Sequence, residues 1–551
     1  MLKLPEIFSD HMMLQRGKPV KIFGTSDAGK TIRVCLNDPA GRTEAEAKAR
    51  ADRKGCFTVI LPELSAGSDK SLMITDGEER ITIHDVAAGE VWLAGGQSNM
   101  EYLMNTDAEI AKERAGLSAL SEAEKREIRF YDCPEISFNG MEKRADLSNF
   151  GRWRCLSEED IVYFSAVSYY FERKIKDSLD CPVAVIGCNW GGTKAACWVQ
   201  EETVRKAGAD IWIDEYKEGL AQIPDPDAAE EAFKNSPMNV LSDPAHPNPF
   251  DQILFPGFSK EMQENAMKMM PSGADAMMAI GRLHPWRPCG LYETMLKKIM
   301  PYTIRGFLWY QGCSDEAHPE VYAQLMRALI KKWREDFEDP SLPFLQVQLA
   351  PFSWWLGNGG DNYPAVRKAQ EEASDTTPDT YLASMGDAGM IYDIHPKHKR
   401  KPGERLGLLA LRHIYGLDIA ADAPRAENMT FEGDTAIIRF KNGEGLQLTD
   451  PENAGLTAEE AAAAGFCDPA VPESLGKEEN LKALLKVRPE GDVNAEIADD
   501  LLRISLCVEG KPVKPERVEF ACTPYYEVNV KNAAGLPVFP FVMEAEADQF
   551  T

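Results

Sequence analysis

A buried strand that ends in two glycines and a serine constrains the fold of this chain more than any other stretch. Residues 91–94 form an apolar run, and Gly95 and Gly96 follow where the backbone must turn sharply or approach another group closely. Ser98 is therefore delivered at the carboxyl end of a strand, which in open α/β sheets faces the ligand-binding crevice. We expect Ser98 to be a nucleophile, or else simply to cap the segment that follows. The stretch is not a Gly-x-Ser-x-Gly elbow, because Met100 occupies the place of its second glycine.

Helical and strand patterns alternate after Ser98. Apolar residues recur at helical spacing in residues 164–179, 321–333 and 365–373, and short apolar strands are expected at 182–187, 305–310, 345–349 and 381–385. This alternation predicts a mainly parallel sheet with helices on both faces. Residues 4–87 instead carry short strands separated by turn residues at β-sandwich spacing, and β-signals return from about residue 428.

A chain of 551 residues exceeds what one hydrophobic core usually supports, so several domains are expected. We predict an N-terminal β-domain (1–87), an α/β catalytic domain (88–425) and a C-terminal β-domain (426–551). An irregular insert near 221–285 is rich in proline and methionine, which is compatible with plain packing or with a flap over a ligand. An acidic insert near 457–500 is expected to form a short helix and a surface loop.

Composition excludes several classes of partner. The net charge of -27 argues against binding to nucleic acid or to an anionic membrane, because phosphate binding needs clustered Lys and Arg. Twelve cysteines occur without a C-x-x-C pair or zinc-like spacing, so we expect no metal, no cofactor and a reducing compartment. The first residues lack an apolar leader core and no stretch approaches a membrane span, so a cytoplasmic location is expected unless a leader has been removed. The oligomeric state is left open.

Four strand-to-loop exits carry glycine or polar residues: Ser98, Gly191-Gly192, residues 311–315 and residues 386–395. A serine hydrolase needs a base near its hydroxyl, a carboxylate that orients the base, and donors for the oxyanion. His395 lies between the last expected sheet strand and the helix expected at 402–415, and Asp393 could orient it. The four exits therefore supply a candidate for each part.

Blander interpretations of these residues stay open. His395, His398 and His413 could form a surface cluster, and their short spacing could suggest a metal, although no third ligand is marked. Gly191 and Gly192 could form no more than a turn.

Four motif blocks follow one another along the chain: Gly96-Gln97-Ser98-Asn99-Met100, Trp190-Gly191-Gly192-Thr193, Trp309-Tyr310-Gln311-Gly312 and Asp393-Ile394-His395-Pro396. Together they resemble the motifs of the sialate O-acetylesterase family, a branch of the SGNH hydrolases. Residues 4–16 and 532–537 are similar to that family as well, so the likeness spans nearly the whole chain.

The resemblance implies a three-layer α/β/α SGNH domain joined to β-sandwich-like domains, and the removal of acetyl groups from carbohydrate hydroxyls. It implies Ser98 as nucleophile, His395 as general base and Asp393 as the carboxylate that orients the base, with Asp387 as an alternative. The oxyanion hole would be formed by Ser98, a glycine N–H from Gly191 or Gly192, and the position of Asp315. Substrate contacts are expected from Gln97, Trp190 and Gln311.

The oxyanion loop departs from the family pattern. Family members typically have Gly-Glu-Ser-Asn where this chain has Gly312-Cys313-Ser314-Asp315. An ionised aspartate cannot donate a hydrogen bond. Asp315 could therefore be protonated, orient another donor, or have lost the role.

The sugar that carries the acetyl group is open. A sialate carboxylate commonly meets an arginine fork, for which Arg282 and Arg287 are candidates. Acetylated xylan or another neutral plant glycan would favour aromatic platforms, and the candidates are Trp190, Trp198, Trp354 and Trp355. An alternative of another class is a carbohydrate-binding protein with a decayed esterase site.

Overall fold

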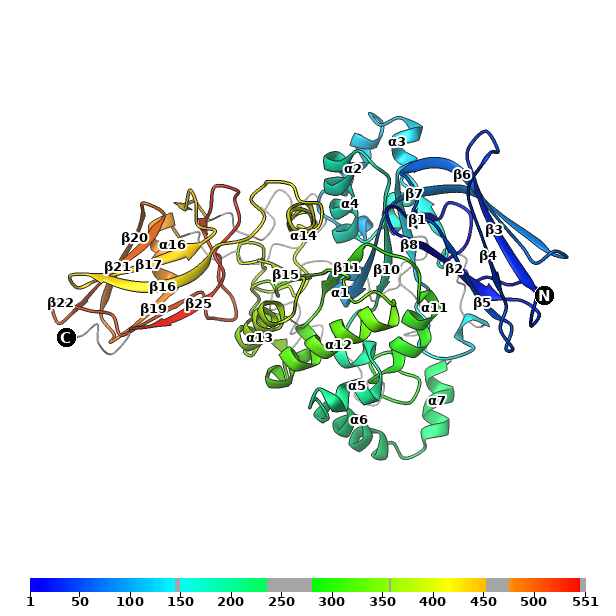
Figure 1. Cartoon of the computed structure of the whole chain (residues 1–551). Helices are drawn as coiled ribbons and strands as arrows, with labels where there is room; N and C mark the ends of the chain where they lie inside the picture. Colours follow the sequence, from blue (N-terminus) through cyan, green and yellow to red (C-terminus); the bar gives the residue numbers. More distant parts are fainter. Residues whose placement is uncertain (144–148, 235–279, 356–357, 452–474, 546–551) are drawn as a thin grey trace. The chain divides into compact units, whose positions relative to one another are not determined.

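The computed structural model describes residues 1–143, 149–234, 280–355, 358–451 and 475–545 (Figure 1). The chain divides into two compact units. The first takes in residues 1–251, 273–346 and 372–381, and the second takes in residues 252–272, 347–371 and 382–551. The methionine-rich part of the expected insert, and with it the predicted flap, lies outside the described residues.

A central sheet organises the first unit. Its strand order is β15-β12-β11-β7-β10-β8-β9. Strand β7 pairs in parallel with β10 and β11, β10 with β8, and β11 with β12, whereas β9 is antiparallel to β8. The predicted α/β fold is confirmed, and the whole sheet is mixed because antiparallel N-terminal strands continue it. The strands are β7 (Arg80–Gly96), β8 (Ile128–Asp132), β9 (Trp153–Cys155), β10 (Val183–Asn189), β11 (Gly306–Tyr310), β12 (Phe344–Val347) and β15 (Thr380–Ala383).

Helices cover both faces of this sheet (Figure 1). Side chains alternate along a strand, so Trp92 and Gly95 of β7 point to opposite faces. The ring of Trp92 packs edge-on against Phe171 of α4 (Ala166–Leu179), 5.2 Å between centroids. On the other face, a Cβ at Gly95 would lie 2.8 Å from Trp333 of α12 (Tyr322–Asp336). The first unit therefore contains an α/β/α arrangement around β7.

Local signals explain the boundaries of α4. The Ser165 hydroxyl accepts the backbone N–H of Ser168, which satisfies one of the free donors of the first turn. The helix ends at Asp180, which adopts the left-handed conformation with φ 47°. The other α-helices in the described part of this unit are α1 (Ser98–Glu101), α2 (Ile110–Leu117), α3 (Glu122–Arg126), α5 (Glu201–Lys206), α6 (Ile211–Ala221), α7 (Pro226–Lys234) and α11 (Lys297–Ile299).

Most of the N-terminal strands are continuous with the central sheet, whereas β2 and β5 pair with each other in a separate sheet. β7 has 17 residues, and its first half pairs antiparallel with β6 while β1 pairs in parallel with its middle. The boundary expected between residues 87 and 88 thus falls inside one strand, and the three-domain division stays a prediction. The other strands here are β1 (Met13–Gln15), β2 (Val20–Thr25), β3 (Thr31–Asn37), β4 (Thr43–Arg50), β5 (Cys56–Leu61) and β6 (Gly67–Thr75).

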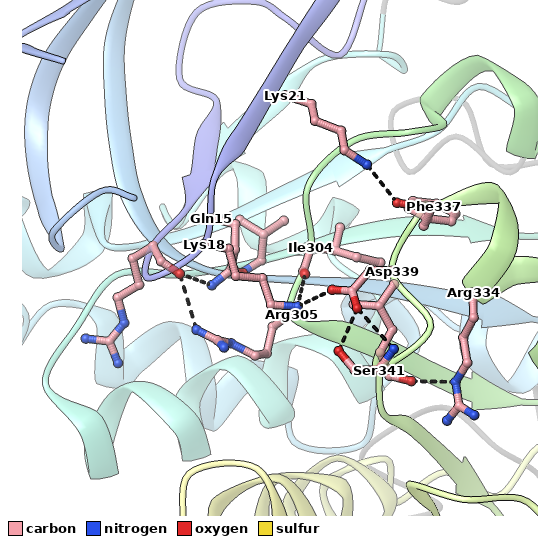
Figure 2. A network of polar contacts seen from close by, with 12 residues as sticks. Gln15, Lys18, Lys21, Ile304, Arg305, Arg334, Phe337, Asp339 and Ser341 are labelled. Atoms are coloured by element: carbon pink, nitrogen blue, oxygen red, sulfur yellow. Dashed lines mark hydrogen bonds and ion pairs between the residues drawn. The ribbon is translucent and has the colours of Figure 1, made fainter. Parts of the chain in front are cut away.

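Polar contacts join this N-terminal region to the loop after α12 (Figure 2). Lys18 forms an ion pair with Asp339 at 2.8 Å, and the Lys21 ammonium donates to the Phe337 carbonyl at 3.0 Å. Deeper in the unit, the buried Glu90 forms ion pairs with Arg16 at 2.6 Å and with Arg305 at 2.7 Å. Burial tends to raise the pKa of Glu90, but the two guanidinium groups outweigh it and lower that pKa below its usual value.

The C-terminal part of the second unit is built from two antiparallel sheets over one apolar core. Strands β16-β17-β21-β20 pair in that order with β22 beside β21, and β19-β23-β25 form the other sheet. Ile438, Ile504 and Val518 lie in the core. The strands are β16 (Arg425–Glu432), β17 (Thr435–Lys441), β19 (Leu485–Arg488), β20 (Asp492–Ala498), β21 (Leu501–Val508), β22 (Lys511–Val513), β23 (Arg517–Phe520) and β25 (Phe541–Glu544).

Two 14-residue helices and several shorter elements complete the described part of the second unit and its borders. They are β13 (Trp354–Trp355), β14 (Asn358–Gly359), α13 (Tyr363–Thr376), α14 (Arg400–His413), β18 (Gln447–Leu448), α16 (Lys477–Ala483) and β24 (Val530–Lys531). The helix expected in the acidic insert is present as α16, and residues 457–474 of that insert lie outside the described residues. Among the helices described, none combines the length and the apolarity needed to cross a membrane.

Candidate active site

Ser98 lies at the carboxyl end of β7, as the sequence predicts. Gly96 has φ 138°, and a Cβ there would overlap the Tyr310 carbonyl oxygen, so the turn after the strand requires glycine. The Gln97 N–H donates to that same carbonyl at 3.2 Å. Ser98 then begins the one-turn helix α1 and is half-buried. The tight turn therefore fixes where the serine backbone leaves the sheet.

The glycine pair after β10 borders Ser98. The Trp190 N–H donates to the Gly96 carbonyl at 3.2 Å, which holds this loop against the serine turn. A Cβ at Gly191 would lie 3.4 Å from the Ser98 Cβ, and one at Gly192, which has φ 71°, would lie 2.5 Å from the Trp286 indole. Gly191 and Gly192 therefore form a turn and also let Ser98 and the Trp286 ring approach the backbone closely.

Two buried amides tie the strand exits of the first unit together. The Gln97 Oε1 accepts the Gly312 N–H at 3.0 Å, and its Nε2 donates to the Ser314 hydroxyl at 3.3 Å. The Gln311 Nε2 donates to the Thr193 carbonyl at 3.0 Å. Both side chains therefore hold neighbouring loops together. A direct contact of Gln97 or Gln311 with substrate stays a prediction.

Trp190 lies beside these loops and is half-buried. It packs against a small apolar cluster that includes Ile136, Phe138 and Phe150. Contact between Trp190 and a substrate likewise stays a prediction.

Asp315 is fully buried and acts as an acceptor. Its Oδ2 accepts the Ala195 N–H at 3.0 Å and the Gln311 amide, while its Oδ1 has no hydrogen-bond partner among the described residues. Burial raises the pKa of Asp315 to about 6. Asp315 therefore holds residues 193–195 in place next to the glycine pair. Its carboxyl group would have to be protonated before it could donate a hydrogen bond to an oxyanion.

The predicted base, His395, and its predicted orienting carboxylate, Asp393, belong to the second unit. His395 and Asp393 lie between β15 and α14, and both are buried, so the alternative of a surface histidine cluster is wrong for His395. The backbone N–H of His395 donates to the Asp393 Oδ1 at 2.7 Å, and the ring Nδ1 of His395 lies 3.7 Å from the same oxygen. Lys397 forms a buried ion pair with the other carboxylate oxygen at 2.8 Å. Ser98 lies in the first unit.

The surroundings of His395 favour its neutral form. Burial, followed by the positive charges of Lys397 and Lys399, holds the pKa of His395 well below its usual value. Burial raises the pKa of Asp393 even though Lys397 opposes it. The Trp355 ring stands perpendicular to the imidazole at 5.2 Å. A neutral imidazole can accept a proton from a hydroxyl.

Asp387, the alternative orienting carboxylate, has other partners. It is buried and forms ion pairs with Arg405 at 2.8 Å, Lys531 at 3.1 Å and Lys401 at 3.4 Å. Although burial tends to raise the pKa of Asp387, these three cations lower it far below its usual value. The described contacts therefore favour Asp393 over Asp387 beside His395.

The expected arginine fork finds little support. Arg282 forms ion pairs with Asp227, at 2.7 Å, and with Glu230. The Arg287 guanidinium donates to the His284 carbonyl at 3.0 Å. Arg282 is thus already neutralised by two carboxylates.

The expected aromatic platforms differ in exposure. Trp198 is fully buried, and its indole donates to the Thr193 hydroxyl at 3.1 Å, so the interpretation of Trp198 as a platform is wrong. Trp354 and Trp355 are half-buried in β13 of the second unit. Sequence reasoning missed Trp286, whose indole N–H donates to the Gly191 carbonyl at 2.8 Å. Its only sequence signal is an aromatic residue between two prolines at the end of the irregular insert.

One group of side chains has the spacing of metal ligands. His11, Asp85 and Cys155 offer ligand atoms within 4.8 Å of one another. The His11 Nδ1 lies 2.6 Å from Asp85, which also meets Arg129 at 3.0 Å. The hydrogen bond to Asp85 raises the pKa of His11 to about 10, and a protonated imidazole has no lone pair for a metal. These contacts are those of an ion-pair network.

Comparisons with known proteins agree with the motif blocks. A family model described as a carbohydrate esterase, sialic acid-specific acetylesterase, matches residues 257–405. The mouse sialate O-acetylesterase is 25% identical over 457 residues, covering 77% of this chain and 74% of its own length. The human sialate O-acetylesterase is 23% identical over 457 residues, covering 78% and 72%. A crystal structure of a carbohydrate acetylesterase from Xanthomonas citri has a TM-score of 0.68 at 22% identity, covering 99% of this chain and 100% of its own, which supports the fold.

The fold, the motif blocks and these matches together define a class, the carbohydrate esterases that hydrolyse acetyl esters. The predictions that this chain is an enzyme and that it is a carbohydrate acetylesterase are thereby confirmed. Within that class, the matching family model and the relatives named above are sialate O-acetylesterases, in agreement with the motif blocks of this chain.

Proposed function

We propose that this chain removes acetyl groups from the hydroxyls of O-acetylated sialic acid through an acetyl-enzyme on Ser98. The observation that carries the proposal is the position of Ser98 on the turn after β7, with Gly191 bordering its Cβ. The likeness to named sialate O-acetylesterases supplies the substrate class.

The first half of the reaction acylates the serine. The neutral His395 takes the proton of the Ser98 hydroxyl as its Oγ attacks the acetyl carbonyl carbon. Backbone N–H groups of Ser98 and of Gly191 or Gly192 stabilise the resulting oxyanion. The imidazolium then protonates the sugar oxygen, the C–O bond breaks, and the sugar alcohol leaves.

The second half returns the free enzyme. Water loses a proton to His395 and attacks the acetyl carbonyl, and the proton then returns to the Ser98 oxygen as acetate departs. Asp393 keeps the imidazole oriented and stabilises its protonated form. The proposal requires Ser98 of the first unit and His395 of the second unit to meet in the working enzyme.

Acetate release tests the proposal directly. We would compare 9-O-acetylated sialic acid with an acetylated xylo-oligosaccharide, using the wild-type chain, Ser98→Ala and the matched control Ser178→Ala on the exposed side of α4. We expect release from the sialate, at least a thousandfold loss of kcat in Ser98→Ala, on the order of the cost of losing a catalytic nucleophile, and no change in Ser178→Ala. Substantial turnover by Ser98→Ala would exclude Ser98 as the nucleophile. Preference for the xylo-oligosaccharide would retain the mechanism and replace the substrate, and release from neither substrate would favour the decayed-esterase alternative.

We also propose a reducing, cytoplasmic location. The eleven cysteines in the described part of the chain are all free thiols, as expected where disulfides do not persist. Fractionation of the source cells followed by thiol labelling of the native protein would test this location.

A further inference from the structure

A cavity of about 740 Å³ opens in the first unit beside the glycine pair. Its lining includes Lys194, Trp212, Glu215, Tyr216 and Trp286. Sites for small organic ligands occupy roughly 300–1,000 Å³ and combine apolar walls with a few polar groups. The volume and the lining of this cavity fall within that description, and none of the motif blocks accounts for it.

The cavity shares a wall with the proposed oxyanion loop. Trp286 lines the cavity, and its indole donates to the Gly191 carbonyl at 2.8 Å while its ring lies against Gly192. Gly191 in turn borders the Ser98 Cβ. One side chain, Trp286, therefore separates the cavity from the loop that borders Ser98.

The charged side chains that line the cavity differ in whether they already have a partner. Glu215 is paired with His318 at 2.7 Å, and the Asp225 carboxylate accepts the Ala228 N–H at 3.0 Å at the start of α7. The Lys194 ammonium lies over the Trp212 ring, 4.2 Å from its centroid, and forms no ion pair with any carboxylate among the described residues. Lys194 is thus the cationic group of the lining that is left for an anionic ligand.

We infer that this cavity is the sugar subsite of the esterase and that Lys194 binds the carboxylate of an acidic pyranose. This inference rests on the proposed function. The apolar face of the sugar ring packs against Trp286 and Tyr216, as pyranose rings do on aromatic side chains. The carboxylate meets Lys194 in a charge-assisted hydrogen bond, and the acetylated side chain of the sugar extends past Gly191 to Ser98. Lys194 is a positioning residue, because it holds the substrate without touching the reacting ester.

The test separates sugar binding from ester chemistry. We would measure KM and kcat for 9-O-acetylated sialic acid, for its 1-carboxamide, which lacks the negative charge, and for 4-nitrophenyl acetate, which lacks the sugar. The variants are Lys194→Met, the charge-conserving Lys194→Arg, and Lys297→Met as a matched control on an exposed lysine paired with Glu293. For Lys194→Met we expect KM for the sialate to rise on the order of tenfold, which is typical of losing one hydrogen bond to a charged group.

The same variant should leave KM for the carboxamide and the turnover of 4-nitrophenyl acetate within twofold of the wild-type values. Lys194→Arg should recover most of the sialate KM, and Lys297→Met should change nothing. Equal losses on all three esters would mean that Lys194 acts through the oxyanion loop, and an unchanged sialate KM would mean that the carboxylate binds elsewhere; either result overturns the subsite. A wild-type chain that hydrolyses 4-nitrophenyl acetate but not the sialate also overturns it, whereas failure on every ester refutes the proposed function itself.

Discussion

Replacing Asp315 by asparagine should stabilise the protein at neutral pH. The buried carboxylate accepts two hydrogen bonds through its Oδ2, from Ala195 and from Gln311, and its Oδ1 has no partner among the described residues. An asparagine whose carbonyl oxygen takes the place of Oδ2 keeps both bonds and removes the buried charge. The amide is nearly the same size as the carboxyl group, so the surrounding packing is kept.

The size of the effect follows from the shifted pKa. The pKa of Asp315 is about 6 in the folded protein against an ordinary value of 3.8, so between these pH values the folded state holds a proton that the unfolded chain has released. Stability therefore falls as the pH rises through this window and levels off above it. At about 1.4 kcal/mol per pKa unit, the full loss is about 3 kcal/mol, of which about 1.4 kcal/mol develops between roughly pH 5 and pH 7.5.

Urea unfolding of the wild-type chain and of Asp315→Asn, followed by tryptophan fluorescence at several pH values from about 5 to 7.5, measures this difference. We expect the advantage of Asp315→Asn to grow by about 1.4 kcal/mol across the series and to reach a plateau. A difference that does not depend on pH would refute the reasoning, because it would mean that Asp315 titrates alike in the folded and unfolded chains. A rise of kcat in the same variant would show that the amide also acts as the donor that the family pattern places there.

Three further predictions concern the scaffold and the base. Glu90→Gln should lower the free energy of unfolding by about 2 kcal/mol, because it removes the buried charge that pairs with the half-buried guanidinium groups of Arg16 and Arg305, and an effect below about 0.5 kcal/mol in urea unfolding would contradict this. Gly96→Ala should abolish activity, since the new methyl group overlaps the Tyr310 carbonyl, and a crystal structure of an active variant with an unmoved turn would exclude this explanation. The acid limb of the pH profile of kcat/KM should lie below pH 6.5, the ordinary pKa of histidine, because the pKa of His395 is lowered. Lys397→Met removes a positive charge near the imidazole and should move that limb to higher pH. An unmoved limb would mean that it does not report the protonation of His395.

The strand-turn-serine stretch could be predicted because its signals are local. An apolar run ending in Gly95 and Gly96 makes a short buried strand and a tight turn in most surroundings, so the place of Ser98 follows from a few adjacent residues. The alternation of helix and strand predicted a mainly parallel central sheet for the same reason. The predicted boundary after residue 87 falls inside β7, because one strand pairs with β6 in its first half and with β10 in its second half, and no local signal in the sequence shows this continuity.

Partners distant in the sequence decided the rest of the candidate site. Nothing local to Asp315 indicates that its carboxylate braces Ala195, or that Asp387 is neutralised by Lys531 while Asp393 stays beside His395. A buried polar group takes whichever partner the packed chain brings within reach, and that choice depends on the whole fold.

The sequence by itself determined the class of chemistry, because the candidate nucleophile, the candidate base and the glycine loop each lie in a short motif. Only the tertiary structure decided which polar groups are already committed and which remain for a substrate. Arg282 and Lys194 illustrate the difference. In the sequence Arg282 is a cation of the irregular insert and Lys194 is a cation just after the glycine pair. In the structure Arg282 is paired with two carboxylates, whereas Lys194 lines a cavity. Charge pairing and burial depend on distances between side chains from separate elements, and these distances exist only in the folded chain.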